Sequence, residues 1–197
     1  SQYEFAPKIL GVDVSYFGDD QSVIFLRQGI SSKVLWRGRE VDTVDLAGYV
    51  GEFIIRENID ATFVDAGGPG AGVIDQLKRL GHEPISIYFG GKSYKKQYLN
   101  KRAEMWGDMR DWLKGGADIP DENELGEELG GIEYHMTLKG QIQLEKKELM
   151  KKRGLSSPDS ADALALTFAQ PVYKYNPLER GRKEEQTMAK TSYKVLG

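Results

Sequence analysis

The chain has 197 residues and a formal net charge of -3, which is the size of one ordinary domain with a sizeable core. It contains no cysteine, which excludes disulfides, thiolate zinc sites and cysteine nucleophiles, and its two histidines leave few candidates for a histidine-rich metal site or a serine–histidine triad. The start lacks a basic and then apolar signal region, and no apolar run approaches membrane-spanning length. We therefore expect a soluble protein of a reducing compartment.

The first third of the chain predicts an antiparallel meander followed by a helix. Short apolar runs, separated by turns that contain glycine and serine, indicate strands over Lys8–Val14, Ser22–Arg27 and Lys33–Arg37. Apolar residues at helical spacing then predict a helix over Val44–Asn58, with Asp42 or Thr43 as its N-cap.

The middle of the chain alternates between strands and helices. A strand over Ala61–Asp65 is followed by a glycine-rich stretch at 67–70, whose expected task is to turn the chain, and by a helix that stops at Gly81. Next come a strand over Pro84–Tyr88 and a long amphipathic helix over Asn100–Lys114. The pattern after this helix is weaker and predicts no element before residue 132.

The last part of the chain predicts a hairpin and two helices. The hairpin pairs Ile132–Leu138 with Gln141–Leu144, and a short helix follows over Glu145–Lys152. The final helix is almost entirely apolar, with Ser157 expected as its N-cap and Pro158 at its first helical position.

Acidic residues stand at places that the fold should bring together. Asp13 and Asp65 end two predicted buried strands, and side chains at strand ends point into the crevice where open α/β sheets bind ligands. Asp162 lies on the last helix, where a buried carboxylate is expensive unless it is paired or binds a metal. The three residues predict an oxygen-rich pocket for magnesium or manganese. Asp159 shares a helix face with Asp162 and is either a helix cap or a further metal ligand.

Basic residues are concentrated in two stretches close to these acids in sequence. Although the net charge disfavours a nucleic-acid partner, this distribution favours one, and ordinary solvated charge is the alternative interpretation. The candidate DNA-binding residues are Lys92, Lys95, Lys96, Lys101, Arg102, Lys139, Lys146 and Lys147. We expect a domain over residues 1–173 and a flexible polar tail over 174–197.

The order of these segments resembles a known family. The motifs are Gly11-Val12-Asp13, Phe63-Val64-Asp65, Asn100-Lys101-Arg102-Ala103-Glu104, Lys139-Gly140-Gln141-Ile142 and the run from Ser157 to Leu164. With three strands, a helix and two further strands before the late helix, the chain resembles the ribonuclease H-like nucleases. More specifically, it is similar to the nuclease domain of the large terminase subunit, the DNA-packaging motor of tailed bacteriophages.

This resemblance implies a fold and an activity. The fold is a ribonuclease H-like mixed sheet, an antiparallel three-strand meander plus parallel strands, flanked by helices and with an added β-hairpin. The activity is endonucleolytic cutting of concatemeric double-stranded viral DNA during packaging. Two divalent ions, Mg2+ or Mn2+, perform the hydrolysis. By the same resemblance Asp13 bridges both ions, Asp65 binds one and Asp162 the other, with Asp159 close by.

The resemblance also implies partners and a place of action. These are double-stranded DNA, the small terminase subunit, the portal protein and an ATPase domain of the same protein, at the viral procapsid in the host cytoplasm. Unlike the whole family protein, the present sequence contains no ATPase domain. Gly91-Lys92-Ser93 imitates the end of a phosphate-binding loop, but Ser86 stands where the first glycine of that loop is required.

Three other functions remain open at this stage. A Holliday-junction resolvase or transposase would use the same acids on different DNA. An actin-like nucleotide-binding module shares the strand meander and would bind ATP without cutting DNA. A catalytically silent DNA-binding domain is the third alternative.

Overall fold

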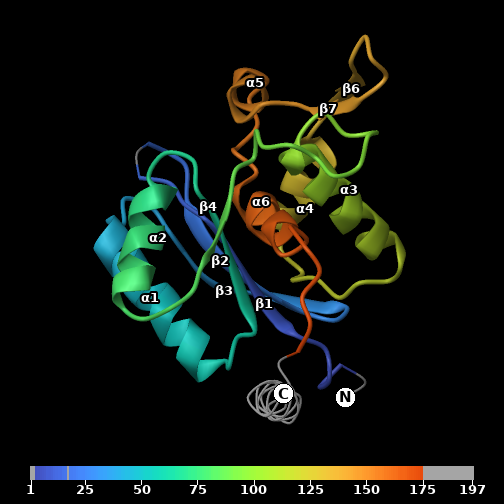
Figure 1. Ribbon diagram of the computed structural model, residues 1–197. Helices are drawn as coiled ribbons and strands as arrows, with labels where there is room; N and C mark the ends of the chain where they lie inside the picture. Colours follow the sequence, from blue (N-terminus) through green and yellow to red (C-terminus); the bar gives the residue numbers. More distant parts are fainter. Residues whose placement is uncertain (1–2, 17, 175–197) are drawn as a thin grey trace, which may run out of the picture.

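The computed structural model describes residues 3–16 and 18–174 and is built around one mixed β-sheet (Figure 1). The five strands lie in the order β3-β2-β1-β4-β5. Their bounds are β1 Lys8–Asp13, β2 Ser22–Gln28, β3 Ser31–Gly38, β4 Ala61–Asp65 and β5 Ile85–Ile87. Each of these five predicted strands is therefore confirmed, with ends shifted by at most two residues.

The sheet combines the two kinds of pairing that were expected. β2 is antiparallel to β1 and to β3, whereas β4 runs parallel to β1 and to β5. Because β1 and β4 are neighbours with the same direction, their carboxyl ends lie at the same edge of the sheet. The ribonuclease H-like fold class is thereby confirmed.

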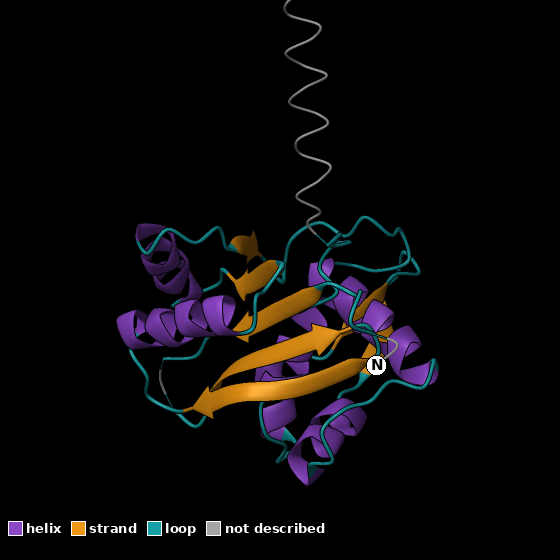
Figure 2. Ribbon diagram, turned by 90° about the horizontal axis from the view of Figure 1, so that it is seen from below, coloured by secondary structure: helices purple, strands orange, loops and turns teal. Residues whose placement is uncertain are grey.

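Helices cover both faces of the sheet (Figures 1 and 2). Helices α1 and α2 lie on one face, and α3, α4 and α6 lie on the other. The helix bounds are α1 Thr43–Arg56, α2 Gly70–Arg79, α3 Lys101–Lys114, α4 Asn123–Gly131, α5 Lys147–Lys152 and α6 Asp159–Leu166. The expected cap of α1 is confirmed, because Asp42 accepts a hydrogen bond from the Asp45 backbone N–H.

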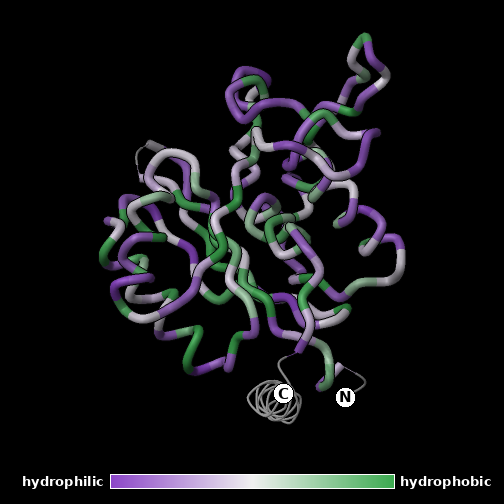
Figure 3. Tube along the Cα trace, in the orientation of Figure 1, coloured by the Kyte–Doolittle hydropathy of each residue, from purple (hydrophilic) through white to green (hydrophobic). Residues whose placement is uncertain are grey.

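Two apolar cores hold the layers together. The first joins α1 and α2 to the sheet through fully buried residues such as Leu46, Val50 and Leu77. The second joins α3, α4 and α6 to the opposite face and contains Phe25, Phe63, Leu125 and Leu164. Figure 3 accordingly shows apolar stretches along the central strands and helix α6. Strands that are buried on both faces explain why their sequences are continuously apolar.

A small second sheet stands apart from the main one. It is the hairpin of β6, Tyr134–Met136, and β7, Ile142–Leu144, and it projects beside α5 at one end of the molecule (Figure 1). The expected hairpin is therefore confirmed, with a shorter first strand. No helix in the described ranges is long and apolar enough to cross a membrane.

Helix α4 and the start of α6 differ from the sequence prediction. Helix α4 was missed, because its sequence is rich in glutamate and glycine and has few apolar positions. Ser157 does not cap α6. The cap position belongs to Pro158, and the Ser157 hydroxyl instead donates a hydrogen bond to Asp159 Oδ1 at 2.6 Å. Of the predicted tail, residues 175–197 lie outside the described part of the chain.

Candidate active site

Strands β1 and β4 bring two of the predicted acids side by side. The pairing between these two strands ends at Val12 and Val64. Asp13 and Asp65 are the next residues of each strand. Parallel strands in register direct such residues to the same face and the same edge. Asp13 is 1% exposed, whereas Asp65 is half-buried.

Helix α6 adds two more carboxylates to this edge, and Gly11 allows it to do so. A Cβ atom at Gly11 would lie 1.9 Å from the Ala163 carbonyl oxygen, so a glycine is needed for the helix to approach β1 this closely. This contact holds the first turn of α6, with Asp159 and Asp162, against the end of β1. Both carboxylates are buried.

The ammonium group of Lys147 lies among these carboxylates. Its Nζ is 3.0 Å from Asp13 Oδ2, 3.3 Å from Asp159 Oδ1 and 3.3 Å from Asp162 Oδ2. Lys147 belongs to α5, and its side chain keeps 26% exposure. One cation from the chain itself therefore neutralises part of the charge of this acidic cluster, which we define as Asp13, Asp65, Asp159 and Asp162.

Asp162 is held from the opposite side by helix α3. Arg102 donates to both carboxylate oxygens, from Nε at 3.0 Å and from Nη2 at 3.2 Å, and the Trp106 indole N–H donates to Oδ1 at 2.7 Å. A carboxylate has room for about four hydrogen bonds. Asp162 therefore accepts three hydrogen bonds and also forms an ion pair with Lys147, so few positions on its oxygens are free.

Asp65 is oriented by the glycine-rich turn that follows it. The Gly67 backbone N–H donates to Asp65 Oδ1 at 3.0 Å. A Cβ atom at Gly70 would lie 1.6 Å from the Asp65 carbonyl oxygen, so the chain can fold back at this point only with glycine. The expected turning role of this stretch is thus observed, together with a contact to the acid itself.

Burial and mutual repulsion set the charges in the cluster. Burial raises the pKa of Asp13 well above its usual value; the Lys147 ammonium lowers it, and Asp162, Asp159 and Asp65 raise it further. Burial also raises the pKa of Asp65. For Asp162, burial is outweighed by Arg102 and Lys147, so its pKa is lowered. The carboxylates outweigh burial at Lys147 and raise its pKa.

The donor set suits a hard cation such as Mg2+ or Mn2+. Asp13 Oδ1 is buried and has no hydrogen-bond partner, and Asp13 Oδ2 has Lys147. Asp159 accepts from Ser157 and Lys147 on one oxygen and from the Gln21 N–H on the other. Within residues 3–16 and 18–174, no group of three acids or histidines lies close enough to hold an ion together. Because the Lys147 ammonium group lies between Asp13, Asp159 and Asp162, it would have to move away before a metal ion could bind there.

The open oxygen positions rank the four acids as metal ligands. With the Lys147 contacts set aside, and within the described residues, Asp13 accepts no hydrogen bond, Asp65 accepts one, Asp159 accepts two and Asp162 accepts three. The sequence had given Asp162 the metal role and left Asp159 between a cap and a ligand. In the structure Asp162 accepts one more hydrogen bond than Asp159 apart from the Lys147 contacts, through Arg102 and Trp106.

The candidate DNA-binding residues separate into three groups. Lys92, Lys95, Lys96, Lys139 and Lys146 are exposed. Lys101 and Arg102 are buried and pair with Glu104 and Asp162, so they are not available for DNA. Lys147 belongs to the acidic cluster. The sequence pattern gave no signal for the roles of Lys147, Arg102 and Trp106, because each depends on contacts between distant segments.

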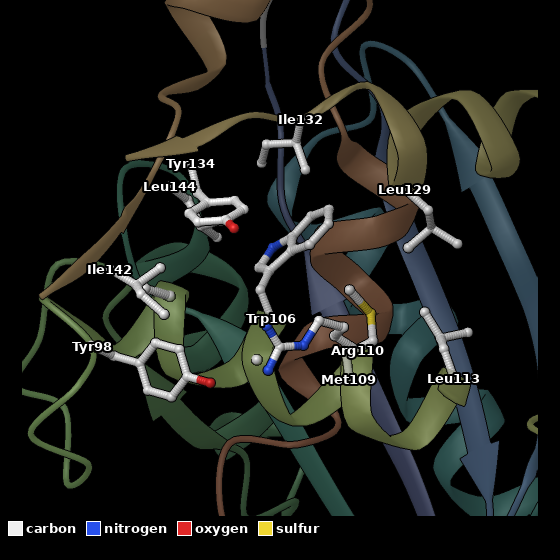
Figure 4. A pocket seen from close by; sticks show the side chains of 12 residues that line it. Tyr98, Trp106, Met109, Arg110, Leu113, Leu129, Ile132, Tyr134, Ile142 and Leu144 are labelled. Atoms are coloured by element: carbon white, nitrogen blue, oxygen red, sulfur yellow. The ribbon is translucent and has the colours of Figure 1, made fainter. Parts of the chain in front are cut away.

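An apolar pocket of about 240 Å3 lies beside the site, between α3 and the hairpin (Figure 4). Trp106, Met109 and Leu113 line it from α3, and Tyr134 and Leu144 from the hairpin. No carboxylate of the acidic cluster lines this pocket. Trp106 joins the two sites, since its indole ring faces the pocket and its N–H reaches Asp162.

The sheet order and the position of the carboxylates define a ribonuclease H-like fold with an acidic centre. Solved structures that are similar to this chain include nuclease domains of phage large terminase subunits. The nuclease domain of the large terminase subunit of bacterial virus Sf6 has a TM-score of 0.69 and 20% identity, covering 84% of this chain and 89% of that one. The large terminase nuclease of thermophilic phage G20c has a TM-score of 0.62 and 18% identity, covering 86% and 83%.

These likenesses confirm the resemblance seen in the sequence at the level of the fold. Structures of the two phage proteins have been solved with calcium or manganese for Sf6 and with cobalt or magnesium for G20c. No family model and no curated protein sequence matches the chain.

Proposed function

We propose that this chain is the nuclease part of a phage large terminase subunit, a metal-dependent endonuclease that cuts concatemeric double-stranded DNA during genome packaging. The observation that carries the proposal is the acidic cluster. Four carboxylates meet at one edge of a ribonuclease H-like sheet, and Asp13 among them keeps a buried oxygen without a partner. Buried carboxylates of this kind are unfavourable for folding unless a cation or substrate uses them.

The ligands of our proposal are Asp13, Asp65 and Asp159, which would hold two divalent ions, Mg2+ or Mn2+. Asp162 would contribute its charge and at most one further oxygen position. Such ions supply an activated water and stabilise the leaving 3′ oxygen during in-line attack on the phosphate.

The remaining groups of the site prepare these carboxylates. Arg102 and Trp106 keep Asp162 ionised and fix the first turn of α6, and the Gly67 N–H fixes Asp65. Lys147 acts as the counterion of the cluster before metal binds. Its partly exposed side chain leaves it a route to swing toward the DNA phosphate.

The wider assignments follow the same proposal. The partners are double-stranded DNA, an ATPase domain of the same full-length protein, the small terminase subunit and the portal protein. The place of action is the procapsid in the host cytoplasm. Residues 1–173 form the nuclease domain. The fold likeness to terminase nucleases does not favour a resolvase, a transposase or an actin-like module.

The test is cleavage of supercoiled plasmid with manganese, magnesium or EDTA. The chain should nick and linearise the plasmid only with metal, and Asp13→Ala, Asp65→Ala and Asp159→Ala should each lower the rate at least 100-fold. Asp75→Ala removes an exposed acid of α2 and should cut at the normal rate. Folded wild-type chain that leaves the plasmid intact with either metal would overturn the nuclease assignment.

Asparagine variants separate the proposed roles of Asp159 and Asp162. Asp162→Asn should keep metal-dependent thermal stabilisation, whereas Asp159→Asn should weaken it. The opposite result would restore the order of roles that the sequence suggested.

A further inference from the structure

Glu104 connects the start of α3 to the loop before it. Its carboxylate is buried, and Oε2 accepts hydrogen bonds from the Ser93 hydroxyl at 2.5 Å, the Tyr94 N–H at 2.6 Å and the Lys95 N–H at 2.9 Å. Three successive residues of the loop therefore converge on one oxygen. The Glu104 carboxylate therefore stabilises the turn of this exposed loop.

The same carboxylate is kept charged. Oε1 of Glu104 lies 2.7 Å from the Lys101 ammonium, which is itself buried. Burial raises the pKa of Glu104, but hydrogen bonds from Lys101, Ser93 and Lys95 outweigh it and lower the pKa to about 2. The negative charge of Glu104 is thus part of the loop structure at every physiological pH.

The loop also pairs with the hairpin. The Leu99 N–H donates to the Ile142 carbonyl at 2.9 Å, and the Ile142 N–H donates to the Gln97 carbonyl at 2.8 Å. Tyr98 is buried between the hairpin and α3, where a Cβ atom at Gly107 would lie 2.1 Å from its hydroxyl oxygen. The loop and the hairpin therefore form one continuous ledge, which we define as residues 92–98 together with 134–146.

The exposed side of the ledge is basic. Residues 92–98 contain three lysines and no acid, and the hairpin adds Lys139 and Lys146. Lys95 forms an ion pair with Asp108, whereas Lys92 and Lys96 are exposed and have no acidic partner among residues 3–16 and 18–174. Tyr94 is 86% exposed between these lysines. Exposed lysines with an interleaved aromatic ring suit a nucleic-acid backbone.

The ledge is joined to the acidic cluster through the first turn of α3. Lys101 and Glu104 face the loop, and Arg102, between them in sequence, pairs with Asp162. Nη1 of Arg102 also donates to the Glu145 carbonyl at 2.8 Å, at the end of the hairpin. The first turn of α3 therefore fixes the position of the basic ledge relative to the acidic cluster.

We propose that the ledge receives the backbone of double-stranded DNA next to the cleavage centre, and that Glu104 is the positioning residue that assembles it. Lys92 and Lys96 contact phosphates, and Tyr94 lies against the sugar–phosphate surface. Because these contacts are made to the backbone, they are independent of base sequence. This proposal rests on the proposed function for the identity of the substrate.

The experiment measures binding of a fluorescent DNA duplex in EDTA, where no cleavage can occur, over a series of salt concentrations. The double variant Lys92→Ala/Lys96→Ala should bind at least tenfold more weakly for duplexes of different sequence. Its slope of log affinity against log salt should fall by about 2, since about 0.9 is expected per lost phosphate contact. Lys78→Ala/Arg79→Ala removes the same charge from α2, on the far face of the sheet, and should bind as the wild type does.

Glu104→Gln separates assembly of the ledge from simple charge. Removing a negative charge beside DNA would by itself tighten binding, whereas loss of the loop structure should weaken it at least threefold and expose the Tyr94 and Lys95 amides to hydrogen exchange. The matched control Glu127→Gln, at an exposed position of α4, should change neither quantity. The lysine double variant tests the surface even if Glu104→Gln is less stable.

Several outcomes would overturn the proposal. They are an unchanged salt slope in the lysine double variant, tighter DNA binding by folded Glu104→Gln, or absence of DNA binding by the wild-type chain. Plasmid cleavage distinguishes this failure from failure of the nuclease assignment. Normal metal-dependent cutting with an unchanged salt slope overturns the ledge alone, and salt-dependent binding without cutting overturns the nuclease alone.

Discussion

Lys147 is the residue on which the charge balance of the acidic cluster depends. It contacts three of the four carboxylates, and a divalent ion would have to take its place. We predict that Lys147→Ala lowers the stability of the metal-free protein by about 1–3 kcal/mol, because the carboxylates lose their cation. The same change should tighten manganese binding at least tenfold, since the ion no longer competes with an ammonium group.

Thermal unfolding in EDTA and calorimetric titration with manganese measure these two effects. Lys146→Ala provides the control, because its side chain is exposed and adjacent in sequence. Weaker manganese binding by Lys147→Ala would mean that the lysine assists the metal instead of substituting for it.

Glu128 provides a pH-dependent prediction at the same scale. It is buried on α4 and accepts a hydrogen bond from the Ala161 N–H at 2.7 Å. Burial raises the pKa of Glu128 from 4.5 to about 8; the Ala161 N–H lowers it, and Asp159, Glu124 and Asp162 raise it. Because the folded pKa lies above the unfolded one, the folded state binds the extra proton. Its contribution to stability is complete below pH 4.5 and is lost as the pH rises toward 8.

Glu128→Gln should therefore gain stability over the wild type as the pH rises from 5 to 8. The amide oxygen can still accept from Ala161, and the loss it avoids amounts to about 1.4 kcal/mol per pH unit within that window. Unfolding in EDTA at several pH values measures the difference. A difference that stays constant with pH, or that Glu127→Gln reproduces, would contradict the assignment.

At the scale of elements, the contact between β1 and α6 depends on Gly11. An added methyl group would lie 1.9 Å from the Ala163 carbonyl oxygen, and the helix would have to move away from the sheet. We predict that Gly11→Ala destabilises the domain by about 2–4 kcal/mol, which is in the upper range for overpacking a core. It should also weaken manganese binding, because Asp159 and Asp162 move with the helix.

Gly48→Ala is the matched control for this change. Gly48 is an exposed position of α1 with nothing within 4 Å of an added Cβ, and alanine there should stabilise the helix by up to about 1 kcal/mol. Denaturant unfolding of both variants measures these changes in stability. Equal stabilities for Gly11→Ala and the wild type would mean that the sheet and helix are not in close contact.

Elements could be predicted where local pattern and burial agree. The meander and the helices α1, α2 and α3 follow from apolar spacing and, for α1, from the cap Asp42. Helix α4 could not be predicted, because tertiary contacts hold it: Glu122 and Glu124 pair with Arg37 of β3, and Leu125 is fully buried. A polar segment with several glycines has no helical signal of its own.

At the scale of the whole molecule, we expect the buried carboxylate of Asp13 to lower the stability of the metal-free protein. The raised pKa of Asp13 means that its ionised form is disfavoured by burial and by its acidic neighbours. We predict that Asp13→Asn raises the melting temperature in EDTA by a few degrees and abolishes most of the stabilisation by manganese. A lower melting temperature in EDTA with intact manganese stabilisation would place the metal elsewhere.

The residues of the site could be predicted from the sequence only in part, because some of their contacts join segments that are far apart in the chain. Strand ends and a buried acidic helix identified Asp13, Asp65, Asp159 and Asp162, because their positions follow from the fold class. Charge type alone could not distinguish an exposed lysine such as Lys92 from a buried one such as Lys101. The pairing of Arg102 with Asp162, which lies 60 residues away in sequence, likewise gave no local signal.

The position of Trp106 gives the molecule a built-in optical reporter. Its ring borders the apolar pocket, while its N–H is bonded to a carboxylate of the acidic cluster (Figure 4). Indole emission shifts with nearby charge and with contact to water. In a variant with Trp36→Phe and Trp112→Phe, one fluorophore would report on the arrival of a cation on one side and of an apolar molecule on the other. Chemical libraries could therefore be screened against either site without a nucleic-acid substrate.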